Sequence, residues 1–225
     1  MLGGRYADRA VIVFGAAGAL GSGLAAAFAA EGAAVTGVDR HEPPADRRLE
    51  GVSYEAADAG DDASLAGLFG RLPAPWAIIN TVGGFAPHAP LTELDPGMLT
   101  GQLELNLVTA ALLTKHALAS MKPAGEGRIV HTASRAAVVT RGQGFAYSVS
   151  KLGVIHLVSM AAAEVRGTGI TVNCVVPSII DTPANRAAMP GADHESWPKV
   201  ADVARAYLFL AAPEAHLTSG AAIPV

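Results

Sequence analysis

The chain has 225 residues, of which 51% are hydrophobic and 16% charged, with a net charge of −4 and a mean hydropathy of +0.34. This apolar content is ample for a large core and excludes an intrinsically disordered chain. A nucleic-acid partner is not expected, because the basic clusters do not exceed the pair Arg47-Arg48. A membrane partner is not expected either, since no uncharged apolar run reaches the roughly 18 residues of a membrane span.

The cysteine and histidine content of the chain bears on its cellular compartment and on metal binding. Cys174 is the single cysteine, so no intrachain disulfide can form, and a reducing environment fits this composition. Residues 1–10 lack the apolar core of a signal peptide, and we expect a cytoplasmic location. Cys174 lies in an apolar run, where a buried thiol is the expected state rather than a nucleophile. The histidines show no metal-ligand spacing, so no metal is expected.

Short apolar runs alternate with longer helical patterns along the chain. The predicted strands are Arg9–Phe14, Ala34–Val38, Val52–Glu55, Trp76–Ile79, Arg128–Thr132, Ile170–Val175 and Ala221–Val225. The predicted helices are Ala19–Glu31, Asp61–Arg71, about Met98–Met121, Phe145–Arg166 and Val200–Ala212. Asp61 or Asp62 is placed to cap the second helix. Strands that are apolar on both faces and separated by helices predict an α/β Rossmann fold, a doubly wound, mostly parallel seven-stranded sheet with helices on both faces.

We expect one domain over residues 1–225, with a cofactor half over about 1–130 and a catalytic and substrate-loop half over about 131–225. Proline and glycine concentrate in two loops, Gly83–Pro90 and Pro177–Pro198, each of which follows a predicted strand. Ligands of open α/β sheets bind beyond the carboxyl ends of the strands. Both loops are therefore expected to border a binding site.

A glycine-rich turn, residues 15–21, joins the first strand to the first helix. Small residues allow the backbone to approach a pyrophosphate, and the helix N-terminus offers free N–H groups. The spacing departs from G-x-G-x-x-G, and close packing is the alternative explanation. Asp39 lies about 20 residues further on, where a carboxylate binds the adenosine ribose and repels a 2′-phosphate. The pattern favours NAD(H), although Arg40 keeps NADP(H) open and Asp39 is alternatively a turn residue.

A tyrosine and a lysine are placed for proton transfer. Tyr147 and Lys151 are four residues apart on a predicted helix, so the two side chains share a face. An ammonium group beside a phenol favours the phenolate, which predicts a general acid/base. Such pairs also occur on ordinary solvated helices. Ser134 after the fifth strand and Asn106 within a long apolar helix strengthen the functional interpretation.

These motifs together resemble the short-chain dehydrogenase/reductase family over essentially the whole chain. The cofactor turn is similar, with Ala19 in place of the middle glycine; Asp58 matches an acid that contacts adenine; and Asn80-x-x-Gly83 resembles the Asn-Asn-Ala-Gly motif. Pro177-Ser178-x-x-x-Thr182 resembles a segment whose threonine contacts the carboxamide. The residues expected to bind the cofactor are Gly15, Gly18, Ala19, Leu20, Gly21, Asp39, Arg40, Asp58, Asn80, Gly83, Tyr147, Lys151, Pro177, Ile180 and Thr182.

The resemblance also implies a catalytic tetrad of Asn106, Ser134, Tyr147 and Lys151. In that arrangement Tyr147 transfers the proton, and Lys151 lowers the pKa of Tyr147 and binds the nicotinamide ribose. Ser134 orients the substrate oxygen, and Asn106 holds a water that links Lys151 to solvent. The implied activity is hydride transfer between nicotinamide and a small-molecule substrate. A non-catalytic dinucleotide-binding sensor or scaffold is the alternative, although such a protein is expected to lose the tetrad.

The substrate remains open between two classes. Gly83-Gly84-Phe85, Arg135-Ala136-Ala137 and the stretch Asp181–Trp197 resemble dihydropteridine reductases, which implies a quinonoid dihydropteridine. Those enzymes keep only the tyrosine and lysine of the tetrad, whereas this chain has all four residues, as ordinary carbonyl/alcohol enzymes do. The residues expected to contact substrate are Ser134, Tyr147, Phe85 and Trp197. Trp197 either stacks on a flat ring or anchors its loop.

The predicted helices near 98–121 and 145–166 carry more apolar positions than a one-sided helix needs. Burial against the sheet accounts for part of this excess. The family resemblance implies a homodimer or homotetramer through these two helices, and we expect a symmetric homo-oligomer.

Overall fold

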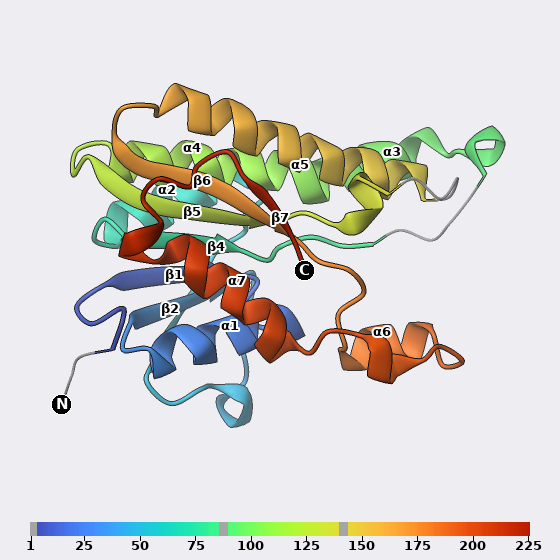
Figure 1. The fold of residues 1–225 in the computed structure, drawn as a ribbon, viewed down its shortest axis with the longest axis horizontal. Helices are drawn as coiled ribbons and strands as arrows, with labels where there is room; N and C mark the ends of the chain where they lie inside the picture. The colour runs from blue at the N-terminus through green and yellow to red at the C-terminus, as the bar shows by residue number, and fades with distance from the viewer. Residues whose placement is uncertain (1–3, 86–89, 140–143) are drawn as a thin grey trace.

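The computed structural model describes residues 4–85, 90–139 and 144–225. Its seven strands pair in parallel in the order β3-β2-β1-β4-β5-β6-β7 (Figure 1), which confirms the predicted doubly wound sheet. The strands are β1 (Ala10–Phe14), β2 (Ala34–Asp39), β3 (Val52–Ala56), β4 (Ala77–Asn80), β5 (Glu126–Thr132), β6 (Gly169–Val176) and β7 (Ala222–Pro224).

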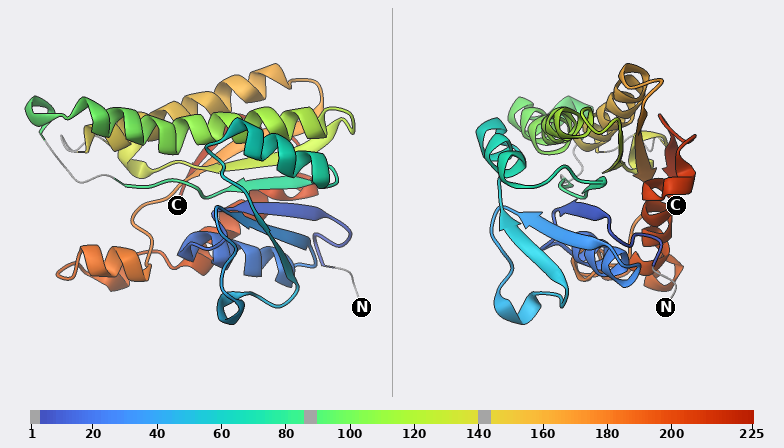
Figure 2. Two further views of the ribbon diagram at one scale, coloured as in Figure 1. Left: turned by 180° about the vertical axis from the view of Figure 1, so that it is seen from behind. Right: turned by 90° about the vertical axis from the view of Figure 1, so that its left-hand side faces the viewer.

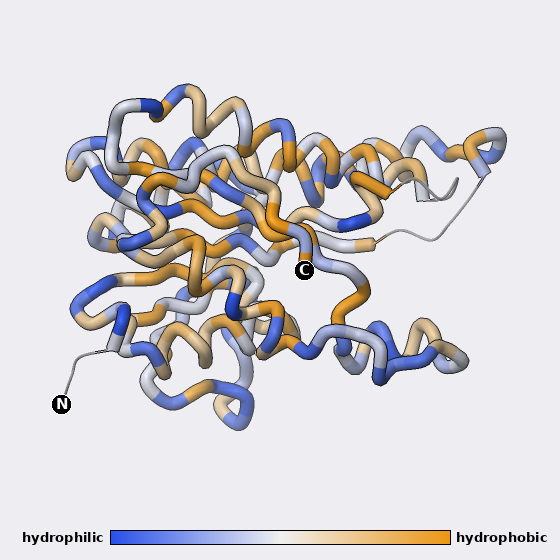
Figure 3. The backbone as a smooth tube through the Cα atoms, in the orientation of Figure 1, coloured by the Kyte–Doolittle hydropathy of each residue, from blue (hydrophilic) through white to orange (hydrophobic). Residues whose placement is uncertain are grey.

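Helices cover both faces of this sheet (Figure 2). One face carries α1 (Ala19–Ala30) and α7 (Val200–Ala211); the other carries α2 (Asp62–Arg71), α4 (Thr109–Met121) and α5 (Phe145–Glu164). Alternate residues of a strand point to opposite faces, so Ile12 of β1 enters one core and Val13 the other. The central strands are accordingly hydrophobic over most of their length (Figure 3).

The long helix predicted over about 98–121 is divided by a π-helical turn. Helix α3 (Pro96–Gln102) leads into the π-helical segment η3 (Leu103–Val108), and α4 follows directly. Such turns are rare and concentrate at functional sites. The turn contains Asn106, which is 1% exposed.

The region predicted as the loop Pro177–Pro198 contains a further helix, α6 (Pro183–Ala188). Thr182 accepts a hydrogen bond from the Asn185 backbone N–H, and Pro183 occupies the first turn, where no donor is required. Helix α6 stands away from the sheet at one end of the molecule (Figure 1). Short 3₁₀ turns occur at Ala45–Arg47, Leu91–Glu93, Arg135–Ala137, His194–Ser196 and Pro213–Ala215.

The strand order reverses at β1 and β4, which are parallel neighbours in the sheet: β2 and β3 are added on one side of β1, and the chain then crosses to β4 on the other side. β1 pairs with β2 on one side and with β4 on the other, and Phe14 lies opposite Asn80. The turns that follow these two residues therefore lie side by side. This is the switch point at which open α/β sheets bind ligands.

Helix α5 is, among the described residues, the one helix long and apolar enough by length and composition to cross a membrane. Its inner face packs against β6 and η3, and 39% of its most apolar window is buried. Core helices of folded domains pass the same test. Apolar side chains remain exposed along α5, including Leu152 and Met160 at 50% and 60%.

A buried arginine secures the sheet at the end away from the switch point. The Arg128 guanidinium is 2% exposed and donates to the carbonyl oxygens of Gly127, Gly169, Ala212 and Pro213 at 2.8–3.2 Å. It also lies 4.5 Å from the Trp76 ring centroid. Arg128 thereby joins β5 to the start of β6 and to the end of α7.

We predict that Arg128→Met lowers the free energy of unfolding by about 3 kcal/mol, because buried carbonyl groups lose a charged donor. Urea denaturation followed by circular dichroism measures the change. Arg5→Met is the matched control, because Arg5 pairs with Glu214 on the surface, with side chains 43% and 59% exposed, and exposed pairs contribute little. Equal destabilisation by both variants would contradict the prediction.

Candidate active site

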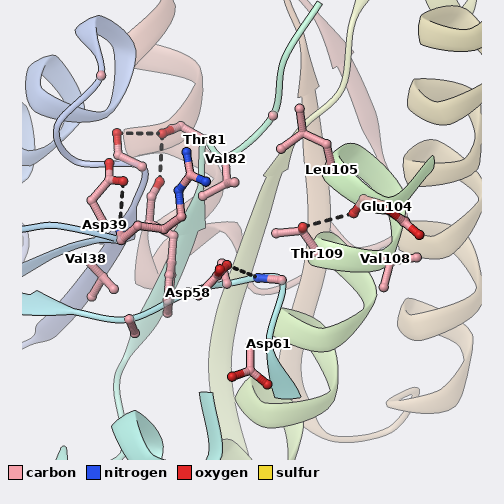
Figure 4. Close-up of a pocket in the computed structure, with 18 of the residues that line it drawn as sticks. Val38, Asp39, Asp58, Asp61, Thr81, Val82, Glu104, Leu105, Val108 and Thr109 are labelled. Atoms are coloured by element: carbon pink, nitrogen blue, oxygen red, sulfur yellow. Dashed lines mark hydrogen bonds between the residues drawn. The ribbon is translucent and has the colours of Figure 1, made fainter. Parts of the chain in front are cut away.

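A pocket of about 690 Å³ lies over the switch point. Gly15 and Gly18 line it from the turn after β1, and Thr81, Val82 and Gly83 line it from the turn after β4. Figure 4 shows Asp39 and Asp58 on one side of the pocket and the helical residues Glu104 and Thr109 on the other. The pocket is therefore bordered by the two turns and by the carboxyl ends of β2 and β3.

The turn after β1 has the geometry of a phosphate cradle. Gly15 has φ +82°, and a Cβ on Gly21 would lie 2.1 Å from the Gly15 carbonyl oxygen. Both positions therefore require glycine. Helix α1 begins after Gly18, includes Ala19 and Leu20, and has no side-chain cap. Its first N–H groups are available to an anion, as a dinucleotide pyrophosphate requires.

The predicted acids border the same pocket. One Asp39 carboxylate oxygen accepts from the Ala17 backbone N–H at 3.1 Å, and the other accepts from the Arg40 N–H at 2.8 Å. Asp39 therefore braces the glycine turn as well as lining the pocket. Asp58 lines the pocket and accepts from the Gly60 N–H at 2.8 Å. Arg40 is also part of the lining.

The opposite wall was not predicted. It consists of Gly101, Glu104, Leu105, Val108 and Thr109, from α3, η3 and the start of α4, and Asp61 adds a further acid. Among the described lining residues, four carboxylates accompany the single cation Arg40. The charged side chains of this lining are therefore mostly negative.

A second pocket of about 190 Å³ adjoins the first, and both are lined by Thr81 and Gly83. Ser134, from the segment after β5, and Tyr147 and Lys151, from α5, converge on it. Phe85 lies at its edge, with its ring 5.2 Å from the Tyr147 ring in an edge-to-face arrangement. The remaining lining residues are Pro177 and Ile180, which were predicted, and Gly84, Thr132, Ala133, Ser178 and Asn185, which were not identified as site residues from the sequence.

Burial dominates the chemistry of the Tyr147 phenol. Desolvation raises the pKa of Tyr147 above its ordinary value, and a hydrogen bond with Ser134 acts in the opposite direction. The expected lowering of this pKa by Lys151 is therefore not found in the folded chain. The phenol is held as a proton donor at neutral pH.

The Lys151 ammonium points toward the backbone of β5. Its Nζ donates to the Thr132 carbonyl oxygen at 2.9 Å, and the side chain is buried. Burial lowers the pKa of Lys151 to about 8. A Cβ on Gly83 would lie 2.9 Å from this Nζ and 2.5 Å from Asn106 Oδ1. Glycine at position 83 therefore allows the turn to pass between the two side chains.

Asn106 acts on the loop after β4. Its Oδ1 accepts from the Gly84 N–H, and its Nδ2 donates to the Gly84 carbonyl oxygen, both at 3.1 Å. Nδ2 also lies within 3.1 Å of Gln102 Oε1 and Ser150 Oγ. The asparagine side chain is thus occupied by protein groups and does not line the second pocket.

Six other predicted residues lie outside the linings of both pockets. Three of them, Ala19, Leu20 and Gly21, form the first turn of α1. Asn80 is buried beneath the turn that follows it. Thr182 caps α6. Trp197 packs against His194, with ring centroids 4.6 Å apart, in a loop whose base is held by Asp181 through ion pairs with two cations. This placement favours the anchoring role of Trp197. Residues 86–89 of the predicted loop Gly83–Pro90 lie outside the described residues.

Comparisons with known proteins agree with this geometry. The matching family model is described as enoyl-(acyl carrier protein) reductase and covers residues 15–225. The cis-4-hydroxycyclohexanecarboxylate dehydrogenase of Sinomonas cyclohexanicum is 34% identical over 100% of this chain and 97% of its own. The D-threitol dehydrogenase of Mycolicibacterium smegmatis is 30% identical over 96% and 91%. A short-chain type dehydrogenase/reductase from Mycobacterium ulcerans has a similar structure, with a TM-score of 0.87 and 27% identity over 98% and 89%.

The narrower resemblance to dihydropteridine reductases gains no support from these relatives, whose names describe dehydrogenases and reductases. The family assignment has two independent supports, the near full-length match and the paired pockets at the switch point. The chain belongs to the short-chain dehydrogenase/reductase family of NAD(P)-dependent oxidoreductases.

Proposed function

We propose that this enzyme interconverts a small uncharged secondary alcohol and its ketone, with Tyr147 as the general acid/base. The observation that carries the proposal is the convergence of Ser134, Tyr147 and Lys151 on a pocket that adjoins the dinucleotide cradle. When bound, the nicotinamide cofactor supplies the hydride chemistry. Gly15, Gly18, Gly21 and the N-terminus of α1 hold its phosphates, and Asp39 holds the adenosine ribose.

The protein residues handle the substrate oxygen and its proton. The Ser134 hydroxyl and the Tyr147 phenol bind the carbonyl oxygen, and Tyr147 donates its proton as the alcohol forms. Lys151 contributes a nearby positive charge and binds the nicotinamide ribose. Asn106 orients the loop at Gly84, which closes one side of the site.

The lining of the second pocket favours an uncharged substrate. Lys151 is the single charged residue among the described lining residues, and Phe85, Ile180 and Pro177 provide apolar surface. The relative from Sinomonas cyclohexanicum is named for a six-membered ring that carries a hydroxyl group and also a carboxylate. That name supports an alcohol on a ring, whereas the preference for an uncharged substrate rests on the pocket lining of this chain. A quinonoid dihydropteridine is the second candidate, through the resemblance of the Asp181–Trp197 stretch.

NAD(H) is the favoured cofactor, because Asp39, Asp58, Asp61 and Glu104 surround the pocket that would receive a 2′-phosphate. Arg40 is the group that would accept NADP(H). The enzyme assembles as a homodimer or homotetramer through α4 and α5. Exposed apolar side chains along α5 support the assembly: Phe145, Val149, Leu152 and Met160.

We predict that Tyr147→Phe lowers kcat/KM for ketone reduction by about a thousandfold, because the proton donor is lost. The Kd for NADH, measured by fluorescence titration, is expected to stay within about twofold of the wild-type value. The assay compares NADH with NADPH over cyclic ketones, open-chain ketones and quinonoid dihydropteridine. Wild-type turnover of a ketone by the variant would refute the acid role. If the wild-type enzyme reduces quinonoid dihydropteridine and none of the ketones, the second candidate substrate is the correct one.

The pH dependence of kcat/KM for NADH in the reductive direction reports the free enzyme. We predict a plateau near neutral pH and a decline as pH rises through about 8, because the Lys151 ammonium loses its proton there. The phenol does not cause this decline, since its pKa is raised. Lys151→Arg is expected to be less active and to lack the decline, because arginine stays protonated. A wild-type midpoint near 10 would contradict the assignment.

We predict that Leu152→Glu shifts the assembly toward a 22.8 kDa monomer in light scattering at micromolar concentration. Leu152 is 50% exposed on α5, so a carboxylate there would be buried unpaired in the interface. Leu217→Glu is the control, because Leu217 is 87% exposed outside α4 and α5. A monomeric wild-type protein would refute the proposed assembly.

A further inference from the structure

A line of buried polar side chains lies beneath the turn that both pockets share. His131 of β5 is fully buried and lies opposite Asn80 of β4 in the parallel register. Asn80 Nδ2 lies 3.1 Å from His131 Nδ1, and His131 Nε2 lies 2.9 Å from Thr114 Oγ1. Neither Asn80 nor His131 lines a pocket.

The hydrogen bonds in this line can point in one direction only. Thr114 Oγ1 donates to the Ala110 carbonyl oxygen at 2.8 Å, which has no proton to give. The Thr114 oxygen must therefore accept from His131 Nε2–H, which leaves His131 Nδ1 as an acceptor for the Asn80 amide group. Asn80 Oδ1 is thereby directed at the Val82 backbone N–H, 2.9 Å away.

The last hydrogen bond of the line holds a turn with little freedom to move. Residues Thr81 and Gly83 line both pockets. Gly83 passes between Asn106 Oδ1 and Lys151 Nζ with no space for a Cβ. The Val82 amide that Asn80 holds is therefore one residue from the point where the turn passes close to the lysine.

The neighbouring residue of β5 makes a second connection. Thr132 Oγ1 donates to the Asn80 carbonyl oxygen at 2.7 Å, and the Thr132 carbonyl oxygen accepts from Lys151 Nζ. His131 and Thr132 thus set the turn and the lysine from consecutive positions of one strand. Burial and the nearby Lys151 charge lower the pKa of His131 to about 3, which keeps the imidazole neutral.

We propose that His131, protonated on Nε2, is a positioning residue that fixes the Asn80 amide and, through it, the turn at residues 81–83 where the nicotinamide end of the cofactor is bound. The proposal rests on the function proposed above for this site. His131 touches neither cofactor nor substrate, and its effect is transmitted through two hydrogen bonds.

The experiment compares Thr114→Val with Thr114→Ser. Valine has the shape of threonine without the hydroxyl, so His131 Nε2–H loses its acceptor and the imidazole is free to move its proton to Nδ1. The Asn80 amide would then turn over, and the Val82 N–H would lose its acceptor. Serine keeps the hydroxyl and serves as the rescuing variant. Neither substitution alters a residue of the two pockets.

Three measurements follow the change from the histidine to the cofactor. Ring ¹⁵N chemical shifts identify the protonated nitrogen of His131, and amide hydrogen exchange follows Val82 in the ligand-free protein. We expect exchange at Val82 to be about tenfold faster in Thr114→Val than in Thr114→Ser. The KM for NADH is expected to rise about tenfold with kcat changed less than about threefold, while ADP-ribose binds as in wild type.

Each result decides a separate point. Protonation of wild-type His131 on Nδ1 would overturn the proposal. Unchanged Val82 exchange and NADH affinity in Thr114→Val, or equal defects in both variants, would also overturn it. If wild-type protein binds neither NADH nor NADPH, the proposed function fails, and the ring shifts and Val82 exchange still decide whether His131 sets the turn.

Discussion

The parallel pairing of β1 with β4 is the constraint on which the site depends. It places Phe14 beside Asn80, so the glycine turn and the turn at 81–83 emerge next to each other. The Thr81 hydroxyl donates to the Phe14 carbonyl oxygen at 2.7 Å and ties the two turns together. A Cβ on Gly15 would lie 2.5 Å from that hydroxyl. The phosphate cradle and the catalytic pocket therefore share one wall, built from two strands that are distant in sequence.

The strands, the long helices and the cap of α2 were predicted correctly because they depend on residues that are close together in the sequence. β-Branched runs and helical periodicity located the strands and long helices, and Asp61 caps α2 as expected. The π-helical turn at 103–108 was not predicted, because the Asn106 contacts to Gly84 and Ser150 come from distant parts of the chain. Helix α6 is too short for periodicity to reveal, although Thr182-Pro183 is a recognisable helix start.

The residues of the candidate site also fall into two groups, those predicted from sequence spacing and those brought together only by packing. The glycine turn, Asp39, Ser134, Tyr147 and Lys151 carry recognisable spacing and line the pockets. The wall formed by Glu104 and Thr109 depends on how a helix packs across the sheet, which spacing does not encode. The raised pKa of Tyr147 likewise arises from burial in the folded chain rather than from its neighbour four residues away. His131 is seen beside Asn80 only once the register of β4 and β5 is known.

The Arg128 contacts lie at the opposite end of the strands from both pockets. Arg128 joins β5 to the start of β6 and to the segment that follows α7, and all its hydrogen bonds go to backbone carbonyl oxygens. These bonds are insensitive to the side chains of the residues that accept them. Loops at the ligand end can therefore diverge in length and composition without weakening this anchor. Such a separation makes the scaffold suited to redesign of substrate range, with α6 and its flanking segments as the natural region to vary.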